Sequence, residues 1–234
     1  MKAIFRREFV SYFTTPIGYI FLAIFFALAG IDYSITSISR GTAEFTQFFL
    51  WLLIILVLLI PILTMRTLSE DKRQKTDQVL LTSPVSLSGV VAGKFLAAFC
   101  VYMMGVAITL VYAVVVSAFA KPDWLTIFGN VVGLLLLGAA CIAIGVFASS
   151  LTENQVISAV ISMASIGLLS LLSVISGYIP IEIVKTILNK ICFLERYIGY
   201  TYGQFDLSNA LYFISVTVAF LFFTVRVLEK RRWA

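Results

Sequence analysis

The chain has 234 residues, of which 61% are hydrophobic and only 12% are charged. Soluble domains have about 25% charged residues, and a domain of about 250 residues leaves about a quarter of its unfolded surface in contact with solvent. These proportions exclude a soluble, disordered or disulfide-stabilised protein. They predict an integral membrane protein, in which a net charge of +5 indicates topology and not nucleic-acid binding.

Six uncharged stretches are long enough to cross a bilayer as helices. Their apolar residues are continuous and do not alternate, which favours helices over barrel strands. The sequence therefore predicts one transmembrane domain, residues 1–234, of the all-α integral membrane class. Its six spans are expected at about 16–37, 45–65, 94–119, 124–149, 156–179 and 207–226.

The orientation of the spans follows from the distribution of Lys and Arg. With six spans, 12 of the 17 basic residues lie on the same side as the termini, and 5 lie on the other side. Because basic residues are enriched in cytoplasmic connections, both termini are predicted to be cytosolic, and the protein is expected in the cell (plasma or inner) membrane.

The segment before the first span, residues 1–15, mixes basic residues with Phe5, Phe9 and Phe13 at helical spacing. This pattern predicts an amphipathic helix on the cytosolic leaflet. A plain continuation of the first span is the alternative. We expect the first span to be retained, because its uncharged stretch is much longer than the apolar region of a signal peptide.

The longest cytosolic connection, residues 66–93, predicts a helix of about three to four turns within residues 66–84, which ends at Pro84. Thr67 and Glu70 have the spacing of a capping box. Asp71 with Lys75 and Glu70 with Gln74 have the i,i+4 spacing of side-chain pairs that support a helix. The segment is too polar to enter the membrane and too short to form a domain. We therefore expect it to contact another protein, although charged connections often only satisfy the topology rule.

Two other connections carry features of interest. Residues 149–155 form a short cytosolic turn, either a second contact point or a plain helical hairpin. Residues 180–206, on the outside, have apolar residues at helical spacing between charged ones. They predict a re-entrant or interfacial amphipathic helix between spans five and six.

The residues of common catalytic and metal sites are missing from the sequence. Histidine is absent, and the spacing of the three cysteines fits neither a zinc site nor a disulfide framework. Residues 89–95 lack the spacing and the Ser or Thr of a P-loop. No intramembrane carboxylate pair is available for ion-coupled transport. We therefore expect no enzyme activity, no catalytic or metal site, no cofactor in this chain and no nucleic-acid partner.

Three motifs resemble those of the permease subunits of ABC type-2 exporters, also called type V exporters. They are the F-R-R-E-F segment before the first span, the stretch from Met65 to Val85, and the turn from Ser149 to Gln155. The second is similar to the family pattern M-R-x-x-x-E-E-K-R-x-G-T-x-E-x-L-L-x-x-P, with Lys75 and Gln78 at its usual Gly and Glu. The compact permeases grouped with gliding-motility ABC transporters are the most similar subgroup.

The resemblance implies a transport permease that forms a homodimer or heterodimer with a second permease. A separate cytosolic ABC ATPase would bind ATP and Mg²⁺ and grip residues 66–84, which act in the family as a coupling helix. The residues implied in coupling are Leu68, Glu70, Asp71, Lys72, Arg73, Thr76, Val79, Leu80 and Glu153. Among them the charged residues would make polar contacts, and Leu68, Val79 and Leu80 would pack into a groove of the ATPase.

Two other functions remain open from the residues alone. The chain could be a transporter outside the ABC class that works without an ATPase. It could also be a membrane scaffold in which residues 66–84 recruit a cytosolic partner and nothing crosses the membrane.

Overall fold

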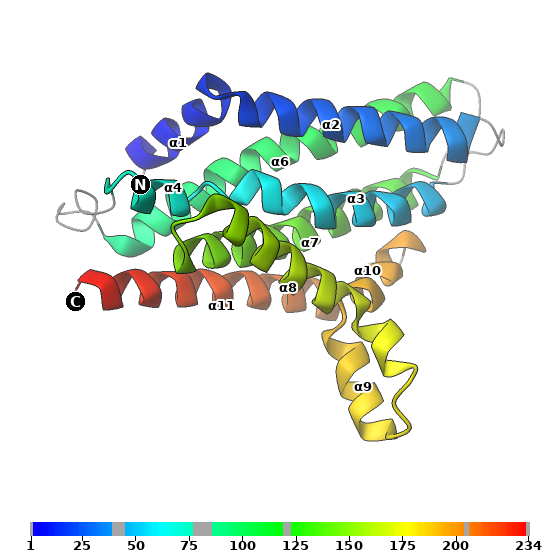
Figure 1. The fold of residues 1–234 in the computed structure, drawn as a ribbon. Coiled ribbons are helices and arrows are strands. Elements are labelled where there is room, and N and C mark those ends of the chain that lie inside the picture. Colours follow the sequence, from blue (N-terminus) through cyan, green and yellow to red (C-terminus); the bar gives the residue numbers. More distant parts are fainter. Residues whose placement is uncertain (1, 39–44, 77–85, 119–122, 204–205, 233–234) are drawn as a thin grey trace.

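The computed structural model describes residues 2–38, 45–76, 86–118, 123–203 and 206–232. Helices make up most of these residues, and turns and short irregular connections account for the rest (Figure 1). The elements are α1 (Lys2–Thr14), α2 (Pro16–Tyr33), the π-helical turn η1 (Ser34–Ile38), α3 (Thr46–Thr64), α4 (Ser69–Arg73), α6 (Leu87–Ser117), α7 (Trp124–Leu151), α8 (Gln155–Ser176), α9 (Glu182–Ile191), α10 (Phe193–Thr201) and α11 (Leu207–Arg232).

Six helical segments of the described chain are long and apolar enough to cross a membrane, as the sequence predicts. They are Pro16–Thr36, Thr46–Arg73, Leu87–Ser117, Trp124–Leu151, Gln155–Ser176 and Leu207–Arg232. The third helix begins earlier than expected, at Leu87, because the Ser86 side chain accepts a hydrogen bond from the Gly89 N–H and caps its first turn.

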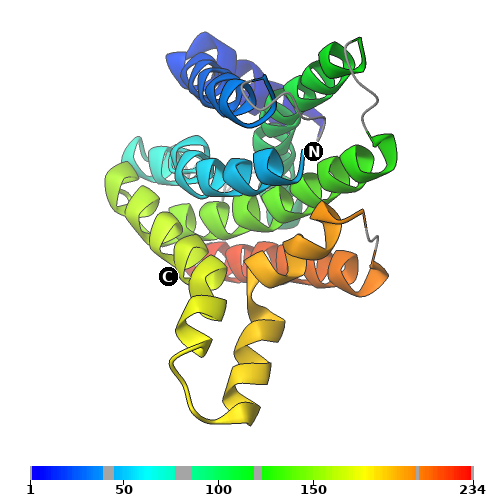
Figure 2. The ribbon, with the colours of Figure 1, turned by 90° about the vertical axis from the view of Figure 1, so that its right-hand side faces the viewer.

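Helix α7 lies at the centre of the bundle and is its most buried span (Figure 2). It packs against α3, α6, α8, α10 and α11. Gly145 allows α3 to approach closely, because a Cβ atom at this position would overlap the Thr64 side chain. Such close contacts between small residues provide the packing that joins helices inside a membrane.

The bundle has two ends, which Figure 1 shows clearly. Both chain termini, α1, α4 and the turn between α7 and α8 lie together at one end, called here the α4 end. Helix α10 lies at the opposite end, called here the α10 end. An even number of spans places both termini at one end, and the side of the membrane that this end faces stays a prediction.

The N-terminal segment is a separate helix and not a continuation of the first span. Thr15 has an extended backbone conformation, and Pro16 occupies the first position of α2. Proline lacks the N–H that would continue α1 but fits the first turn of a new helix. α1 packs on α6 and α2, and its rings form a row in which Phe9 lies 5.8 Å from Phe5 and 5.3 Å from Phe13.

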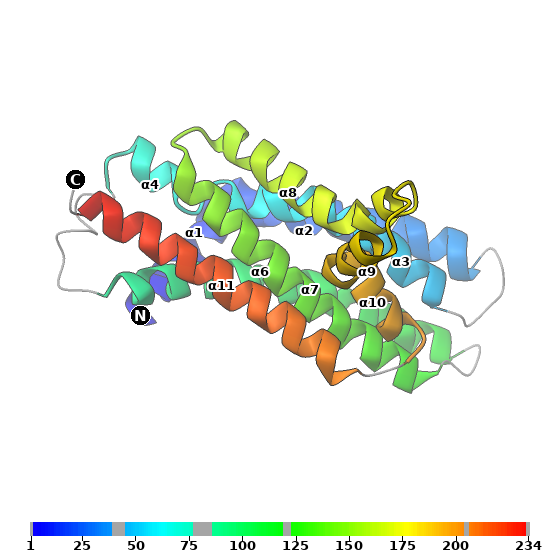
Figure 3. The same cartoon turned by 90° about the horizontal axis from the view of Figure 1, so that it is seen from below.

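Two helices occupy the connection between α8 and α11, where the sequence predicts one. α9 has no buried residue and projects away from the bundle (Figures 1 and 2), so that it points toward the viewer in Figure 3. α10 instead buries Phe193, Tyr197 and Tyr200 completely, against α7 and α11. α9 and α10 are joined at Cys192, whose extended backbone separates the two helices.

Candidate functional site

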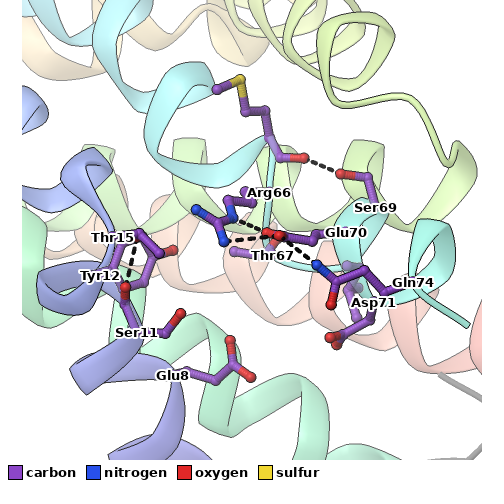
Figure 4. A network of polar contacts seen from close by, with 12 residues as sticks. Glu8, Ser11, Tyr12, Thr15, Arg66, Thr67, Ser69, Glu70, Asp71 and Gln74 are labelled. Carbon is purple, nitrogen blue, oxygen red and sulfur yellow. Dashed lines mark hydrogen bonds and ion pairs between the residues drawn. The ribbon is translucent and has the colours of Figure 1, made fainter. Parts of the chain in front are cut away.

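A polar pocket of about 270 Å³ opens at the α4 end, between α1 on one side and α4 on the other. Figure 4 shows the side chains that face each other across it. The pocket is lined by Arg7, Glu8, Ser11, Tyr12, Thr15, Ile17, Arg66, Thr67, Glu70, Asp71, Gln74, Thr76 and Lys94. Three cationic and three carboxylate side chains lie among these residues, so the pocket lining has no net charge.

The start of α4 is capped by a residue from another helix. Ser149, near the end of α7, accepts hydrogen bonds from the Leu68 and Ser69 N–H groups, both at 2.9 Å. The predicted capping box does not form. The Thr67 hydroxyl donates to the Thr64 carbonyl at 2.8 Å, and α4 has no side-chain cap of its own. The first turn of α4 is therefore bound directly to α7.

Lys72 makes a second connection between α4 and α7. Its side chain is only 4% exposed, and its ammonium group donates to the Ser150 carbonyl. A cation at the C-terminal end of a helix is favoured because the last carbonyl groups are unpaired there. Leu68 is 4% exposed as well. In this conformation Leu68 and Lys72 face their own chain, and contact with another protein would require α4 to move.

The outer side of α4 remains accessible. Arg73, Gln74, Lys75 and Thr76 are exposed. Lys75 adopts a left-handed backbone conformation, with φ of 57°, which an L residue rarely adopts within a helix. Because α4 ends at Arg73, this helix is shorter than the predicted one.

Glu70 connects successive turns of the α4 region. It forms an ion pair with Arg66 and accepts a hydrogen bond from Gln74 at 2.9 Å (Figure 4). The predicted spacing of Glu70 and Gln74 is thus confirmed. Both contacts are of the i,i+4 kind that supports a helical turn, so they stiffen α4 from its outer side.

Lys94 of α6 joins three parts of the pocket, and the sequence did not indicate its role. Its ammonium nitrogen lies 2.7 Å from Asp71 Oδ2 and 3.1 Å from Glu8 Oε1, and it donates to the Thr67 carbonyl at 2.6 Å. The Lys94 side chain is only 1% exposed. Asp71 therefore pairs with Lys94, and the predicted helical pair with Lys75 does not form.

The electrostatics on the α1 side of the pocket follow from the same contacts. The Glu8 carboxylate, 2.6 Å from the Arg7 guanidinium, raises the pKa of Arg7. Burial raises the pKa of Tyr12, so its hydroxyl stays protonated and donates to the Leu63 carbonyl at 3.2 Å. α1 is thus fixed to the end of α3 as well as to α6.

The remaining predicted site residues lie at the edge of this cluster or beyond it. Glu153 is exposed in the turn between α7 and α8. Val79 and Leu80 lie outside the described residues, so their packing stays a prediction. Sequence reasoning missed Glu8 and Lys94, and it named Ser149 only as the start of the 149–155 turn; all three lie outside the α4 segment of the chain. A lysine inside an otherwise apolar stretch was the one available signal.

The cluster connects helices to one another. The described residues contain no group of three or more His, Cys, Asp or Glu side chains that could hold a metal ion. Instead, ion pairs and helix-end hydrogen bonds connect α4 with α1, α6 and α7. A force on the exposed side of α4 would act on three helices of the bundle at once.

Residues 22–224 match the family described as "ABC-2 family transporter protein". The chain belongs to the ABC-2 transporter family. No curated protein matches the sequence. With six membrane-capable helices, this ABC-2 chain is a multi-pass protein of the cell membrane and has the character of an ABC permease subunit. The match includes α4 and Lys94 but begins after α1, so Glu8 lies outside it.

Proposed function

We propose that the chain is the membrane-spanning permease of an ATP-driven exporter, with α4 as the helix that receives the movement of a separate ATPase. The observation that carries the proposal is the double role of α4. Its inner side is fixed to α7 and α6 through Ser149, Lys72 and Asp71, and its outer side is exposed. An element built in this way can transfer displacement from a partner to the bundle.

In this proposal the α4 end is cytosolic. The distribution of basic residues supports this orientation, and so does the position of both termini at the α4 end (Figure 1). The partner ATPase would supply the ATP and Mg²⁺ site, and its nucleotide-dependent closure would press on the exposed Arg73, Gln74 and Thr76. Glu153, in the adjacent turn, would add a second contact.

The resemblance of the sequence motifs to those of known permeases implies three further points. They are export as the direction of transport, pairing with a second permease, and membership of the gliding-motility subgroup. Pairing has additional support, because α8 and α11 are the least buried spans of the single chain. α9, which projects near the α10 end, would lie at the outer surface of the membrane, either interfacial or re-entrant.

Co-purification with a P-loop ATPase in mild detergent, followed by mass spectrometry of the intact complex, tests the partner. We expect two ATPase subunits and two permeases. The Arg73→Glu variant should lose the ATPase, because its reversed charge lies on the proposed contact surface. Lys230→Glu is the matched control, since Lys230 is also exposed at the α4 end but belongs to α11.

Two outcomes would contradict the proposal. One is a wild-type chain that never retains a P-loop protein, as expected for a transporter that works without an ATPase. The other is equal retention in the Arg73→Glu variant and the wild type. A complex that retains the ATPase but shows no effect of the permease on ATP turnover would favour the scaffold function.

The orientation has its own test in intact cells. Gln74→Cys and Tyr178→Cys place reactive thiols at exposed positions of the two ends. In a Cys100→Ala background, a membrane-impermeant maleimide should label position 178 in intact cells and position 74 only after permeabilisation. The reverse pattern would place α4 outside the cell and end the proposal.

A further inference from the structure

Lys94 has an arrangement of partners that suggests more than a static contact. Its ammonium group donates a hydrogen bond to one backbone carbonyl and forms ion pairs with two carboxylates, and these three partners lie on two separate parts of the chain. Thr67 and Asp71 belong to the segment at and just before α4, and Glu8 belongs to α1. The lysine itself belongs to α6, so one buried cation joins α6 to α4 twice and to α1 once.

The two carboxylates differ in what they would lose without Lys94. Glu8 has a second cation, because its Oε1 atom lies 2.6 Å from the Arg7 guanidinium. Asp71 has Lys94 as its one ion-pair partner among the described residues. Both carboxylates are partly buried, with 18% of the Asp71 side chain and 15% of the Glu8 side chain exposed, and leaving such a charge without its partner costs free energy. Breaking the ion pair of Lys94 with Asp71 therefore costs more free energy than breaking its ion pair with Glu8, because Glu8 keeps Arg7 as a partner.

The backbone contact between α1 and α6 lies directly beside this lysine. A Cβ atom on Gly93 would lie 3.1 Å from the Ile4 side chain, so the two helices touch at this point. Glu8 lies one helical turn further along α1 from Ile4. A small rotation of α1 about the Gly93 contact would separate Glu8 from Lys94 without disturbing α4.

We propose that Lys94 is the positioning residue that makes α4 and α6 move as one body, while its contact with Glu8 opens and closes as α1 separates from them. This inference rests on the proposed function, since it assumes that an ATPase displaces α4. It assigns the connection between the coupling helix and the third span to a single buried ammonium group.

Distances between spin labels in the complex with the ATPase test this assignment. Labels at Gln74→Cys directly after α4, Ser88→Cys on α6 and Val10→Cys on α1 occupy exposed positions. Their distances are measured in pairs in nucleotide-free and vanadate-trapped complexes. In the wild type we expect the 74–88 distance to stay constant and the 74–10 distance to change. In Lys94→Met the 74–88 distance should differ between the nucleotide-free and vanadate-trapped complexes, while the ATPase remains bound.

Conservative and compensating variants separate this role from simple loss of structure. Lys94→Arg and the exchanged pair Lys94→Asp with Asp71→Lys should restore a constant 74–88 distance. Should Lys94→Met fail to fold, Asp71→Asn provides the same test, since it removes the same link and leaves Lys94 paired with Glu8. Glu8→Gln should leave the 74–88 distance constant.

The possible failures can be told apart. If no P-loop ATPase is retained by the wild type, the proposed function fails. If the ATPase is retained and the 74–10 distance responds to nucleotide, but the 74–88 distance stays constant in Lys94→Met and Asp71→Asn, only the assignment of Lys94 is overturned. A 74–88 distance that changes with nucleotide in the wild type would overturn it as well.

Discussion

The α4 end and the α10 end of the bundle are held together by different forces. At the α4 end the contacts are ion pairs and helix caps, among them Lys94 with Asp71 and Ser149 with the first N–H groups of α4. At the α10 end aromatic rings surround Phe193, whose ring lies 5.6 Å from Phe213 and 6.1 Å from Tyr212, in both cases edge to face. Hydrogen bonds such as that from Arg196 to Asn209 lie beside them.

This difference suggests that the α10 end stabilises the fold and that the α4 end changes its contacts during transport. Polar contacts are directional and can exchange partners, so an end made of them can occupy two arrangements. Close-packed rings lose contact energy with any small displacement. We therefore expect mutations at the α10 end to lower stability, and mutations at the α4 end to impair communication with the ATPase at a smaller cost in stability.

The largest expected effect on stability is at the α10 end. Phe193→Ala should lower the free energy of unfolding by about 3–5 kcal/mol, because it leaves a cavity beneath α10. The measurement is the midpoint of thermal unfolding in mild detergent, with retention of the ATPase as a second readout. Phe222→Ala is the matched control, since that ring is 51% exposed and should contribute little. Equal shifts in the two variants would show that α10 is not packed as described.

A smaller effect is expected where α7 supports the α4 end. Gly145→Ala should destabilise the protein by about 1–3 kcal/mol, because the added methyl group would overlap Thr64, one helical turn before α4. Gly167→Ala is the control, since a Cβ atom there meets nothing within 4 Å. The same thermal measurement compares them, and a harmless Gly145→Ala would contradict the close approach of α3 and α7.

The cap of α4 should give a third, more local effect. Ser149→Ala removes the acceptor for two buried N–H groups, a loss of about 1 kcal/mol. Hydrogen exchange should become faster at Leu68 and Ser69 but remain unchanged in α10. Ser215→Ala, an exposed serine in α11, serves as the control. Unchanged exchange at both α4 amides would mean that another group caps this helix.

The smallest expected effect depends on pH and belongs to the α10 end. Hydrogen bonds from the Thr126 hydroxyl and from backbone N–H groups lower the pKa of Asp123, which caps α7. A carboxylate with a lowered pKa stabilises the fold above its unfolded pKa of about 3.9, and this contribution disappears as the pH falls through the folded pKa.

Asp123→Asn provides the comparison, because asparagine also caps helices but does not titrate. The difference in unfolding midpoint between wild type and variant should be largest near neutral pH and should shrink as the medium is acidified. A difference that stays constant with pH would show that the charge of Asp123 does not contribute.

The sequence predicted those parts of the fold that depend on hydrophobic length. Six spans could be recognised because a bilayer requires continuous apolar stretches. The break between α1 and α2 could be recognised from Pro16. The presence of two helices instead of one between α8 and α11 could not be recognised, because the break at Cys192 contains neither proline nor glycine.

The candidate site was predictable only in its local part. The i,i+4 contact of Glu70 with Gln74 follows from spacing within one segment and is present. The capping box of Thr67 with Glu70 was wrong, because the N–H groups of these two residues donate to the Thr64 and Arg66 carbonyls. Ser149 caps the neighbouring Leu68 and Ser69 N–H groups from a position about 80 residues away. Long-range contacts of this kind leave no mark on the local sequence, and the partners of Lys94 were hidden for the same reason.

The central claim is that α4 is the contact point of a separate ATPase, and photo-crosslinking tests it most directly. A benzoylphenylalanine side chain placed at Gln74, on the exposed side of α4, should form an adduct in cells with a P-loop ATPase identified by mass spectrometry. The same group at Tyr178, in the exposed segment between α8 and α9, should form no such adduct. A P-loop adduct from position 178, or none from position 74 in cells where the two proteins co-purify, would contradict the account.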